Sequence, residues 1–299
     1  MNQPIFFSII IPTYNRAPLI SATIESILAQ TYKHFEVIIV DDGSTDNTEE
    51  MVRKFLSTNV LYYKKQNAER AAARNFGTRK AKGVYVNWLD SDDILFPGHL
   101  EQAAASIAAF GQPDFFSTGF QYQTEAGQVY YESNYSENVN EDLYKGNPFS
   151  IDSVFIRKEI ALLYPFNEDR MLSGSEDYEL WLRLGARYRI YTSPVITTRF
   201  IHHDERSTMV MSNPNRLIER FTKLIGYALA DRDVVFLLSD NKGFFEMKNN
   251  LILAVDLALH RHLDQSRMYM AKCFHSSPKV ILERGFYAFL KYYIKHTLS

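Results

Sequence analysis

Two hydrophobic periodicities alternate along the first hundred residues, and this alternation limits the fold more than any other feature. Short continuous apolar runs, typical of buried parallel strands, occur at residues 6–11, 35–40, 60–63 and 83–89. Helical patterns separate or follow them, at residues 17–30, 46–55, 69–80 and 97–110. Strands that alternate with helices through short links predict an α/β fold with a mostly parallel sheet flanked by helices.

The pattern changes after about residue 113. Aromatic-rich strands are expected between residues 115 and 131, and the polar stretch 133–147 indicates a surface loop. A strand-like segment follows at 188–201, and the chain is helical in character beyond about residue 212. We therefore predict a ligand-binding and catalytic α/β domain over residues 1–212 and a helical C-terminal region over residues 213–299.

Composition narrows the class of protein. The chain has 299 residues, a formal net charge of −2 and a pI near 6.5, so no basic field is available to hold a nucleic acid. Its single cysteine, Cys273, excludes an internal disulfide and fits a reducing compartment. The N-terminus lacks a signal-peptide pattern, and no run of about twenty apolar residues predicts a membrane span. A cytoplasmic protein is expected.

The acidic segment Asp90–Asp93 follows the fourth predicted strand. Three of its four residues are carboxylates, and like charges this close repel one another unless a cation is present. Carboxylate oxygens are ligands that Mg²⁺ and Mn²⁺ prefer, usually together with a substrate's phosphates. The alternative is a solvated acidic turn that caps the next helix. The segment alone leaves both interpretations open.

Polar residues also follow the first two predicted strands. The first strand leads into Pro12–Arg16 and the second into Asp41–Ser44. Because parallel strands end at one sheet edge, these segments and Asp90–Asp93 should meet in one ligand crevice. Asp42 could accept hydrogen bonds from a base or ribose, although a plain strand-to-helix turn is the alternative. Neither a G-x-G-x-x-G fingerprint nor a P-loop motif occurs.

Two arginines of the 69–80 helix could face phosphates. Arg70 and Arg74 are spaced i, i+4 and share one helix face. They could neutralise a diphosphate or form a solvated basic stripe; the stripe is favoured for Arg70, and both interpretations stay open for Arg74.

Two further pairs of residues, later in the chain, are candidates for catalysis or ligand binding. Glu176 and Asp177 lie where a helix begins, so they could cap that helix or act as a general base. His202 and His203 follow a strand and could bind a metal or a phosphate, or neither.

With these residues in place, the chain resembles the family 2 glycosyltransferases of the GT-A fold over about residues 5–205. Five segments in the family's order carry the resemblance: Ser8–Arg16, Val40–Asp46, Ala73–Asn75, Leu89–Asp93 and Glu176–Arg183.

The resemblance implies roles for individual residues. It implies Asp177 as the catalytic base with Glu176 beside it, and a divalent Mg²⁺ or Mn²⁺ ion on Asp92, with His202 or His203 as a further metal candidate. Pro12 and Tyr14 would border the nucleotide base, Asp42 would bind it, and Asp90 would lie near the ribose. The complete set expected to bind the nucleotide-sugar is Pro12, Tyr14, Arg16, Asp41, Asp42, Arg74, Asp90 and Ser91.

The function implied is an inverting, metal-assisted transfer of one sugar from a nucleoside-diphosphate donor, expected to be a UDP-sugar. The acceptor would be a hydroxyl of a growing glycan, free or lipid-linked. Two departures from the family's pattern matter: Arg70 stands where a glycine is common, and the Q-x-x-R-W element of processive synthases is absent. A sugar nucleotidyltransferase and an inactive nucleotide-sugar-binding protein are the alternatives.

The last predicted helix, residues 279–299, is basic, aromatic-rich and amphipathic. Lys279, Glu283, Lys291 and Lys295 fall on one helical stripe, with apolar residues over the rest. Such a helix could lie on an anionic membrane at its inner face, or it could pack on its own domain.

Overall fold

The computed structural model describes residues 4–124, 126–202 and 213–297. The chain forms two compact units. The first consists of the described residues within Met1–Val139, Pro148–Ser173 and Tyr188–Arg206; the second of those within Asn140–Asn147, Gly174–Arg187 and Ser207–Ser299. Two short segments ahead of residue 212 thus belong to the second unit.

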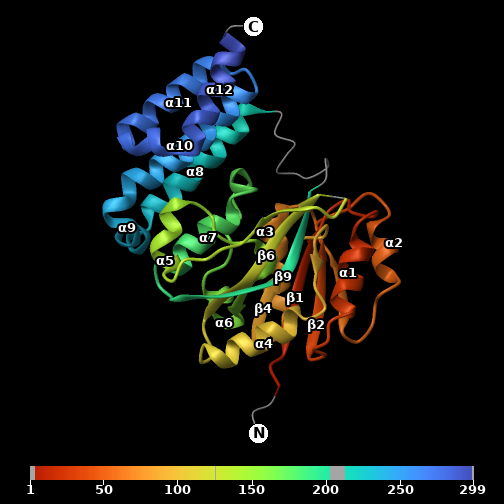
Figure 1. The fold of residues 1–299 in the computed structure, drawn as a ribbon. Helices are drawn as coiled ribbons and strands as arrows, with labels where there is room; N and C mark the ends of the chain where they lie inside the picture. Colours follow the sequence, from red (N-terminus) through yellow and green to blue (C-terminus); the bar gives the residue numbers. More distant parts are fainter. Residues whose placement is uncertain (1–3, 125, 203–212, 298–299) are drawn as a thin grey trace. The chain divides into compact units, whose positions relative to one another are not determined.

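The first unit is built on one mixed sheet (Figure 1). In the described part of the chain its order is β3-β2-β1-β4-β8-β6-β9-β5, with β7 paired to β6. The strands are β1 (Phe7–Thr13), β2 (Phe35–Asp41), β3 (Val60–Lys64), β4 (Tyr85–Trp88), β5 (Ile94–Leu95), β6 (Phe115–Thr124), β7 (Val129–Glu132), β8 (Val154–Arg157) and β9 (Ile190–His202).

Strand direction decides which polar loops share an edge. Strands β3, β2, β1 and β4 are parallel, as the alternating pattern predicts. Strand β8 then runs antiparallel to both β4 and β6, and β6 is parallel to β9. The carboxyl ends of β1, β2 and β4 therefore lie at one edge, where the loop before β8 joins them.

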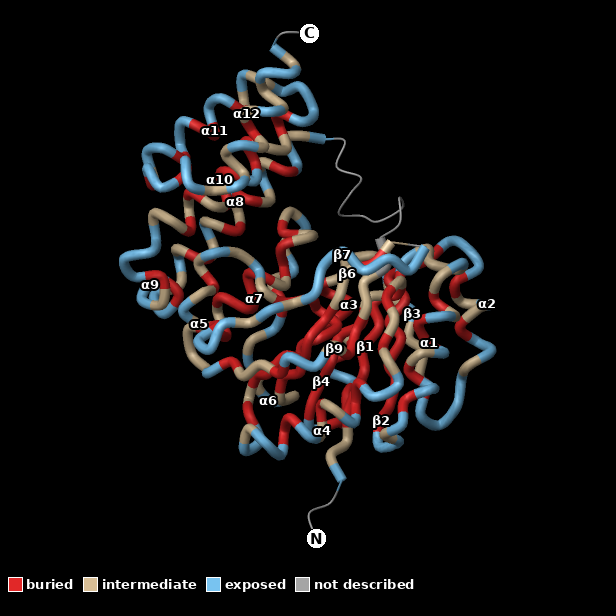
Figure 2. Tube along the Cα trace, viewed as in Figure 1, coloured by how far each residue is buried: buried red, intermediate tan, exposed pale blue. Residues whose placement is uncertain are grey.

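Helices cover both faces of this sheet. α1 (Ile20–Leu28) and α4 (His99–Ala109) bury apolar side chains against one face of β1 and β2, and Figure 2 shows those strands almost wholly buried. α3 (Glu69–Lys80) packs on the other face, where a Cβ on Gly77 would lie 2.4 Å from Cγ2 of Ile10. Its alanines and this glycine thus allow a close approach to the sheet. α2 (Thr48–Arg53) and α6 (Lys158–Leu163) complete the unit's α-helices in the described residues.

The stretch 133–147 differs from the expected surface loop. It contains α5 (Val139–Asp142) and the 3₁₀ turn η1 (Leu143–Lys145), because Val139 and Leu143 each bury an apolar side chain. Because the residues around them in the sequence are polar, these two positions form no hydrophobic pattern that would predict a helix. Strand β5, which pairs with β9, is likewise too short to show a periodicity.

The second unit is helical. It contains α5 from Asn140 onward, η1 and α7 (Glu176–Gly185), followed by α8 (Pro214–Ala230), α9 (Arg232–Leu238), α10 (Lys242–Leu259), α11 (Leu263–Ser276) and α12 (Arg284–Thr297). α10 is central and contacts α8, α9, α11 and α12. The predicted helix 279–299 is interrupted, since a 3₁₀ turn, Pro278–Leu282, precedes α12. None of the helices in the described residues combines the length and apolar character that crossing a bilayer requires.

Candidate functional site

The loops after β1 and β2 are bonded to each other. The Asp42 backbone N–H donates to the Thr13 carbonyl at 2.8 Å, which continues the β1–β2 pairing beyond the strands. Asn15, at φ +50°, accepts from the Thr45 N–H at 2.8 Å through its side chain. Pro12 lies buried at the end of β1, and Tyr14 remains 47% exposed. The first two predicted segments therefore do converge at one sheet edge.

The Asp41 carboxylate forms hydrogen bonds with its own turn and with strand β3. Its buried carboxylate accepts from the Ser44 N–H and from the Tyr62 hydroxyl, each at 2.6 Å. Burial raises the pKa of the Tyr62 hydroxyl, and the hydrogen bond to the Asp41 carboxylate raises it further. These bonds give Asp41 a structural role in holding the turn, whatever it contributes to a ligand.

Asp42 forms an ion pair with Lys65, a residue that the sequence reasoning did not single out. Its carboxylate accepts from Nζ of Lys65 and from the Ala68 N–H, the latter at 3.0 Å. The β2–β3 register, which sets Asp41 beside Lys64, delivers Lys65 to this position. Only that register identifies Lys65 among the chain's lysines, so the sequence offers no separate signal for it.

Arg74 links helix α3 to the turn after β4. Its buried guanidinium lies 2.6 Å from Oδ1 of Asp90 and over the Phe166 ring, 5.3 Å from the centroid. Asn75 exchanges hydrogen bonds with the Phe166 backbone, which fixes that ring's segment. Arg70 lies half-buried one helical turn before Arg74. Arg74 therefore contacts the predicted site directly.

Asp92 and Ser91 occupy the same turn. Oδ2 of Asp92 lies 3.8 Å from Nε of Arg16, so the loop after β1 also reaches this turn. Ser91 is buried. Two arginines therefore contact this turn: Arg16 from the loop after β1 and Arg74 from α3.

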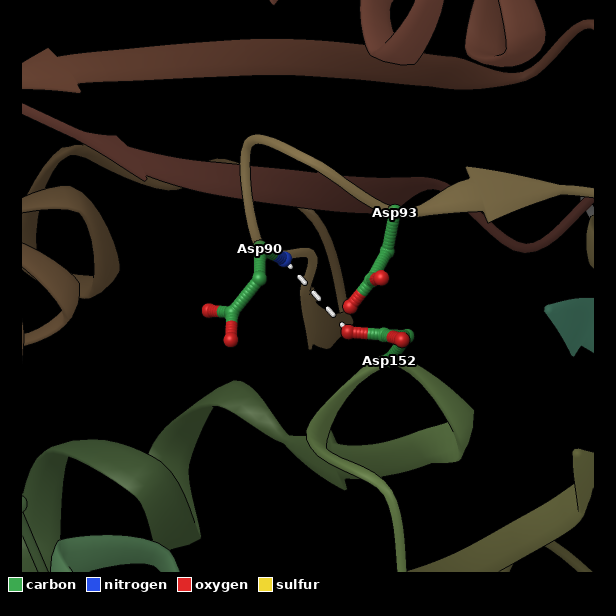
Figure 3. A group of neighbouring side chains, drawn as sticks. All are labelled: Asp90, Asp93 and Asp152. Carbon is green, nitrogen blue, oxygen red and sulfur yellow. Dashed lines mark hydrogen bonds between the residues drawn. The ribbon is translucent and has the colours of Figure 1, made fainter. Parts of the chain in front are cut away.

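A second acidic grouping, formed by Asp90, Asp93 and Asp152, was not fully foreseen (Figure 3). One carboxylate oxygen from each lies within 4.8 Å of the others. Figure 3 shows the Asp93 and Asp152 carboxylates directed toward each other, from the β4 turn and from the 3₁₀ turn Ile151–Ser153. Asp93 precedes β5 rather than a helix, so it does not cap the next helix.

The donor set of this acidic trio fits a hard divalent cation. All three ligand groups are carboxylate oxygens, and Asp93 and Asp152 are fully buried, where like charges repel strongly. The Asp90 N–H donates to Oδ1 of Asp152 at 3.4 Å, and the Ser150 hydroxyl donates to Oδ2 at 3.2 Å. Mg²⁺ or Mn²⁺ therefore matches the chemistry of the site.

The sequence does not identify Asp152 as a site residue, because it is a single acidic residue ahead of a short strand. The antiparallel insertion of β8 beside β4 carries it to the edge of the sheet. Asn87 of β4 then fixes it by donating to the carbonyls of Asp152 and Val154, at 2.7 and 2.9 Å.

One histidine of the predicted pair lies at the end of strand β9. His202 is the last residue of that strand, which pairs with β6 through Thr124. His203 lies outside the described residues.

Glu176 and Asp177 begin helix α7 in the second unit. Buried Glu176 accepts from the Gly174 N–H at 2.5 Å, a bond that holds the turn before the helix. Oδ2 of half-buried Asp177 accepts from the Asn147 side-chain amide at 2.9 Å. Because Asn147 and the α7 start lie in the same unit, Asp177 is held by a side chain as well as by the helix start.

The sequence profile of the family described as Glycosyl transferase family 2 matches residues 8–162, a little over half of the 299-residue chain. The chain belongs to this family. The resemblance and the transferase class inferred from the sequence are confirmed at the level of the family. The matched segment contains both acidic turns and Asp152.

One relative and two solved structures add detail. An uncharacterized glycosyltransferase of Rickettsia bellii is 31% identical over 236 residues, 74% of this chain but only 32% of the relative's length. The present chain therefore spans about a third of the length of that relative.

The structure of Staphylococcus aureus TarS 1–349 in complex with UDP-GlcNAc matches with a TM-score of 0.64 at 20% identity, over 92% of this chain and 90% of that one. The mannosyltransferase PcManGT of Pyrobaculum calidifontis, in complex with GDP-Man and Mn²⁺, matches with a TM-score of 0.58 at 19% identity, over 99% of this chain and 88% of that one. These likenesses confirm the predicted GT-A-type α/β fold with its helical C-terminal region.

Proposed function

We propose that this family 2 member transfers one sugar from a nucleoside-diphosphate sugar to a hydroxyl of a glycan acceptor, free or lipid-linked, with inversion at the anomeric carbon. The convergence of three polar strand ends, after β1, β2 and β4, is the observation that supports it best. A UDP-sugar is the favoured donor, since TarS, which shares the fold, binds UDP-GlcNAc.

In this proposal the strand-end residues hold the donor. Tyr14, exposed at the end of β1, borders the base, and Asp42 accepts a hydrogen bond from it in place of part of its present bonding. Asp90, held by Arg74, contacts the ribose, while Arg16 supplies positive charge beside the diphosphate.

A divalent ion, Mg²⁺ or Mn²⁺, would neutralise the charge that develops on the departing diphosphate. Asp92 is the ligand proposed from the sequence, with His202 or His203 as a further candidate. The acidic trio of Asp90, Asp93 and Asp152 is a second ligand set, favoured by its geometry. The Mn²⁺ in the PcManGT complex supports a metal of this kind.

Asp177 is the proposed general base. It would take the proton from the acceptor hydroxyl as that oxygen attacks the anomeric carbon from the face opposite the leaving group, so that one displacement inverts the centre. The hydrogen bond from Asn147 would orient its carboxylate. Glu176, which holds the preceding turn, would position Asp177 rather than react.

The test is turnover of UDP-, GDP- and TDP-sugars with Mn²⁺, measured as release of the nucleoside diphosphate. Asp177→Asn should lower kcat at least ~10²-fold while leaving donor affinity unchanged, because positioned proton transfer contributes that much. Asp264→Asn, which removes an exposed carboxylate of α11, is the matched control. Normal turnover by Asp177→Asn would eliminate it as the base. Pyrophosphate release from a nucleoside triphosphate and a sugar phosphate would instead favour a nucleotidyltransferase, and binding without turnover an inactive binding protein.

A further inference from the structure

The last helix of the second unit has two distinct faces. α12 packs on α10, where a Cβ on Gly285 would lie 2.9 Å from Leu251; Phe289 is buried, and Phe286 meets the Phe274 ring edge-to-face at 5.9 Å. A second stripe, at spacings of three and four residues, is exposed: Arg284, Tyr287, Lys291, Ile294 and Lys295. A helix that already packs by one face thus presents another to the surroundings.

This second face mixes apolar and basic side chains. Leu282, in the turn before α12, is 76% exposed, and Tyr287 and Ile294 are 63% and 51% exposed. Ile281 adds a further exposed apolar group. We define the basic–apolar face as the exposed stripe of α12 together with the exposed residues of the turn before it, eight residues in all: Lys279, Ile281, Leu282, Arg284, Tyr287, Lys291, Ile294 and Lys295.

The four cations of this face lack anionic partners among the residues that the structure describes. Neither Lys279, Arg284, Lys291 nor Lys295 forms an ion pair there. Glu283, the single acid between residues 279 and 297, is bound to Lys248 at 2.8 Å. Four basic residues against one acid give this segment a charge of +3, although the chain carries −2.

We propose that the basic–apolar face binds the surface of a bilayer that contains anionic phospholipids. Unpaired lysines and an arginine would meet the lipid phosphates, while Leu282, Tyr287 and Ile294 would enter the layer below the headgroups. A second copy of the chain is a poor occupant, because two basic faces repel each other. The exposed apolar groups between the cations favour a lipid layer, which accepts both kinds of side chain at once.

The binding assay uses the full chain and vesicles of phosphatidylcholine, with and without phosphatidylglycerol, followed by flotation. Binding is expected only to vesicles with phosphatidylglycerol, and it should weaken as salt is added. The double substitution Lys291→Gln, Lys295→Gln should weaken it roughly 30-fold, about fivefold for each cation. Leu282→Ser should weaken it about tenfold, through loss of the buried apolar area.

The matched control is Lys33→Gln, Lys54→Gln, which removes two exposed lysines of the first unit. It makes the same change in net charge and should leave vesicle binding unchanged. No binding to anionic vesicles, or equal loss in both double variants, would overturn the proposal. Self-association of the chain that Leu282→Ser abolishes would also overturn it, in favour of a protein partner. The assay needs neither donor nor acceptor, so its outcome is independent of the proposed transfer reaction.

Discussion

Two acidic turns that follow strands β2 and β4 look alike in sequence but differ in how their charges are balanced. In the turn after β2, each carboxylate has local partners: Asp41 binds Ser44 and Tyr62, and Asp42 binds Lys65 and Ala68. In the turn after β4, three carboxylates lie within four residues, and the fold adds Asp152 to them.

This contrast shows why a count of acids does not identify a metal site. Neighbouring strands supply neutralising donors to the first turn, through the β2–β3 register and the start of α3. At the second turn, Arg74 and Arg16 each reach one carboxylate, while Asp93 and Asp152 are brought together in the interior. A divalent cation is best suited to the turn where negative charge is concentrated.

The largest expected effect distinguishes the two turns by kinetics. Asp92→Asn should lower kcat at least ~10²-fold, because charge on the leaving diphosphate would be less well neutralised. Asp42→Asn should instead raise the donor KM about tenfold, the loss of one hydrogen bond to a charged group. The measurement is steady-state turnover over a range of donor and Mn²⁺ concentrations.

Asp114→Asn is the control for that comparison, since Asp114 lies at the amino end of β6, at the opposite edge of the sheet. Its kcat should stay within about twofold of the unmodified enzyme, as expected for a surface substitution away from the site. If Asp42→Asn lowered kcat as strongly as Asp92→Asn, the division between the two turns would be wrong.

A smaller effect is expected at Asp152, where loss of the carboxylate should stabilise the metal-free protein and weaken its binding of Mn²⁺. Asp152→Asn removes one of three neighbouring carboxylates but keeps an oxygen for the Asp90 N–H. The melting temperature without metal should therefore rise, while Mn²⁺ affinity should fall about tenfold or more. Thermal melting with and without Mn²⁺, together with calorimetric titration, measures both.

Asp142→Asn, in the partly exposed ion pair with Lys145, provides the matched loss of one carboxylate. It should change neither quantity appreciably. A lower melting temperature for Asp152→Asn, with unchanged Mn²⁺ affinity, would show that the trio is a structural network.

The last prediction concerns the loss of stability in acid, which involves a histidine away from both turns and must be assigned before the turns are compared by pH titration. Burial lowers the pKa of His99 to about 3, and Nδ1 of His99 lies 2.8 Å from the Thr197 hydroxyl. The unfolded chain, in which histidine has a pKa of about 6.5, therefore binds more protons than the folded chain between these two pH values. The stabilisation is complete above ~6.5 and is lost as the pH falls toward 3, by about 1.4 kcal/mol per pH unit.

His99→Asn keeps a polar group beside Thr197 but removes the titration. Denaturant unfolding at several pH values between 4 and 7 should give a dependence on pH flatter by up to about one bound proton. The same slope in both proteins would assign the acid sensitivity to carboxylates, including those of the two turns.

Local patterns predicted most of the parallel half of the sheet. The apolar runs became β1, β2, β3 and β4, and the helical stripes became the helices α1 to α4, because continuous burial and amphipathic spacing are properties of adjacent residues. The failures lie where burial is sparse. Val139 and Leu143 bury single side chains within a polar stretch, so no periodicity marked α5 and η1.

The candidate site was predicted in part for the same reason. Residues at strand ends, such as Asp42 and Asp90, follow from the strand pattern and the rule that parallel strands end together. Lys65 and Asp152 do not follow from it, since one arrives through strand register and the other through an antiparallel strand far along the chain. The roles of Asp92, Asp177 and the histidine pair stay predictions.

The sequence by itself determined the alternation of strands and helices, the edge at which the acidic turns lie, and the family. Those properties depend on neighbouring residues and on the order of motifs. The tertiary structure decided which carboxylate has which partner: Asp42 has Lys65, Asp90 has Arg74, and Asp93 has Asp152. Ion pairs and hydrogen bonds form only between groups a few ångströms apart, and only the folded chain sets those distances.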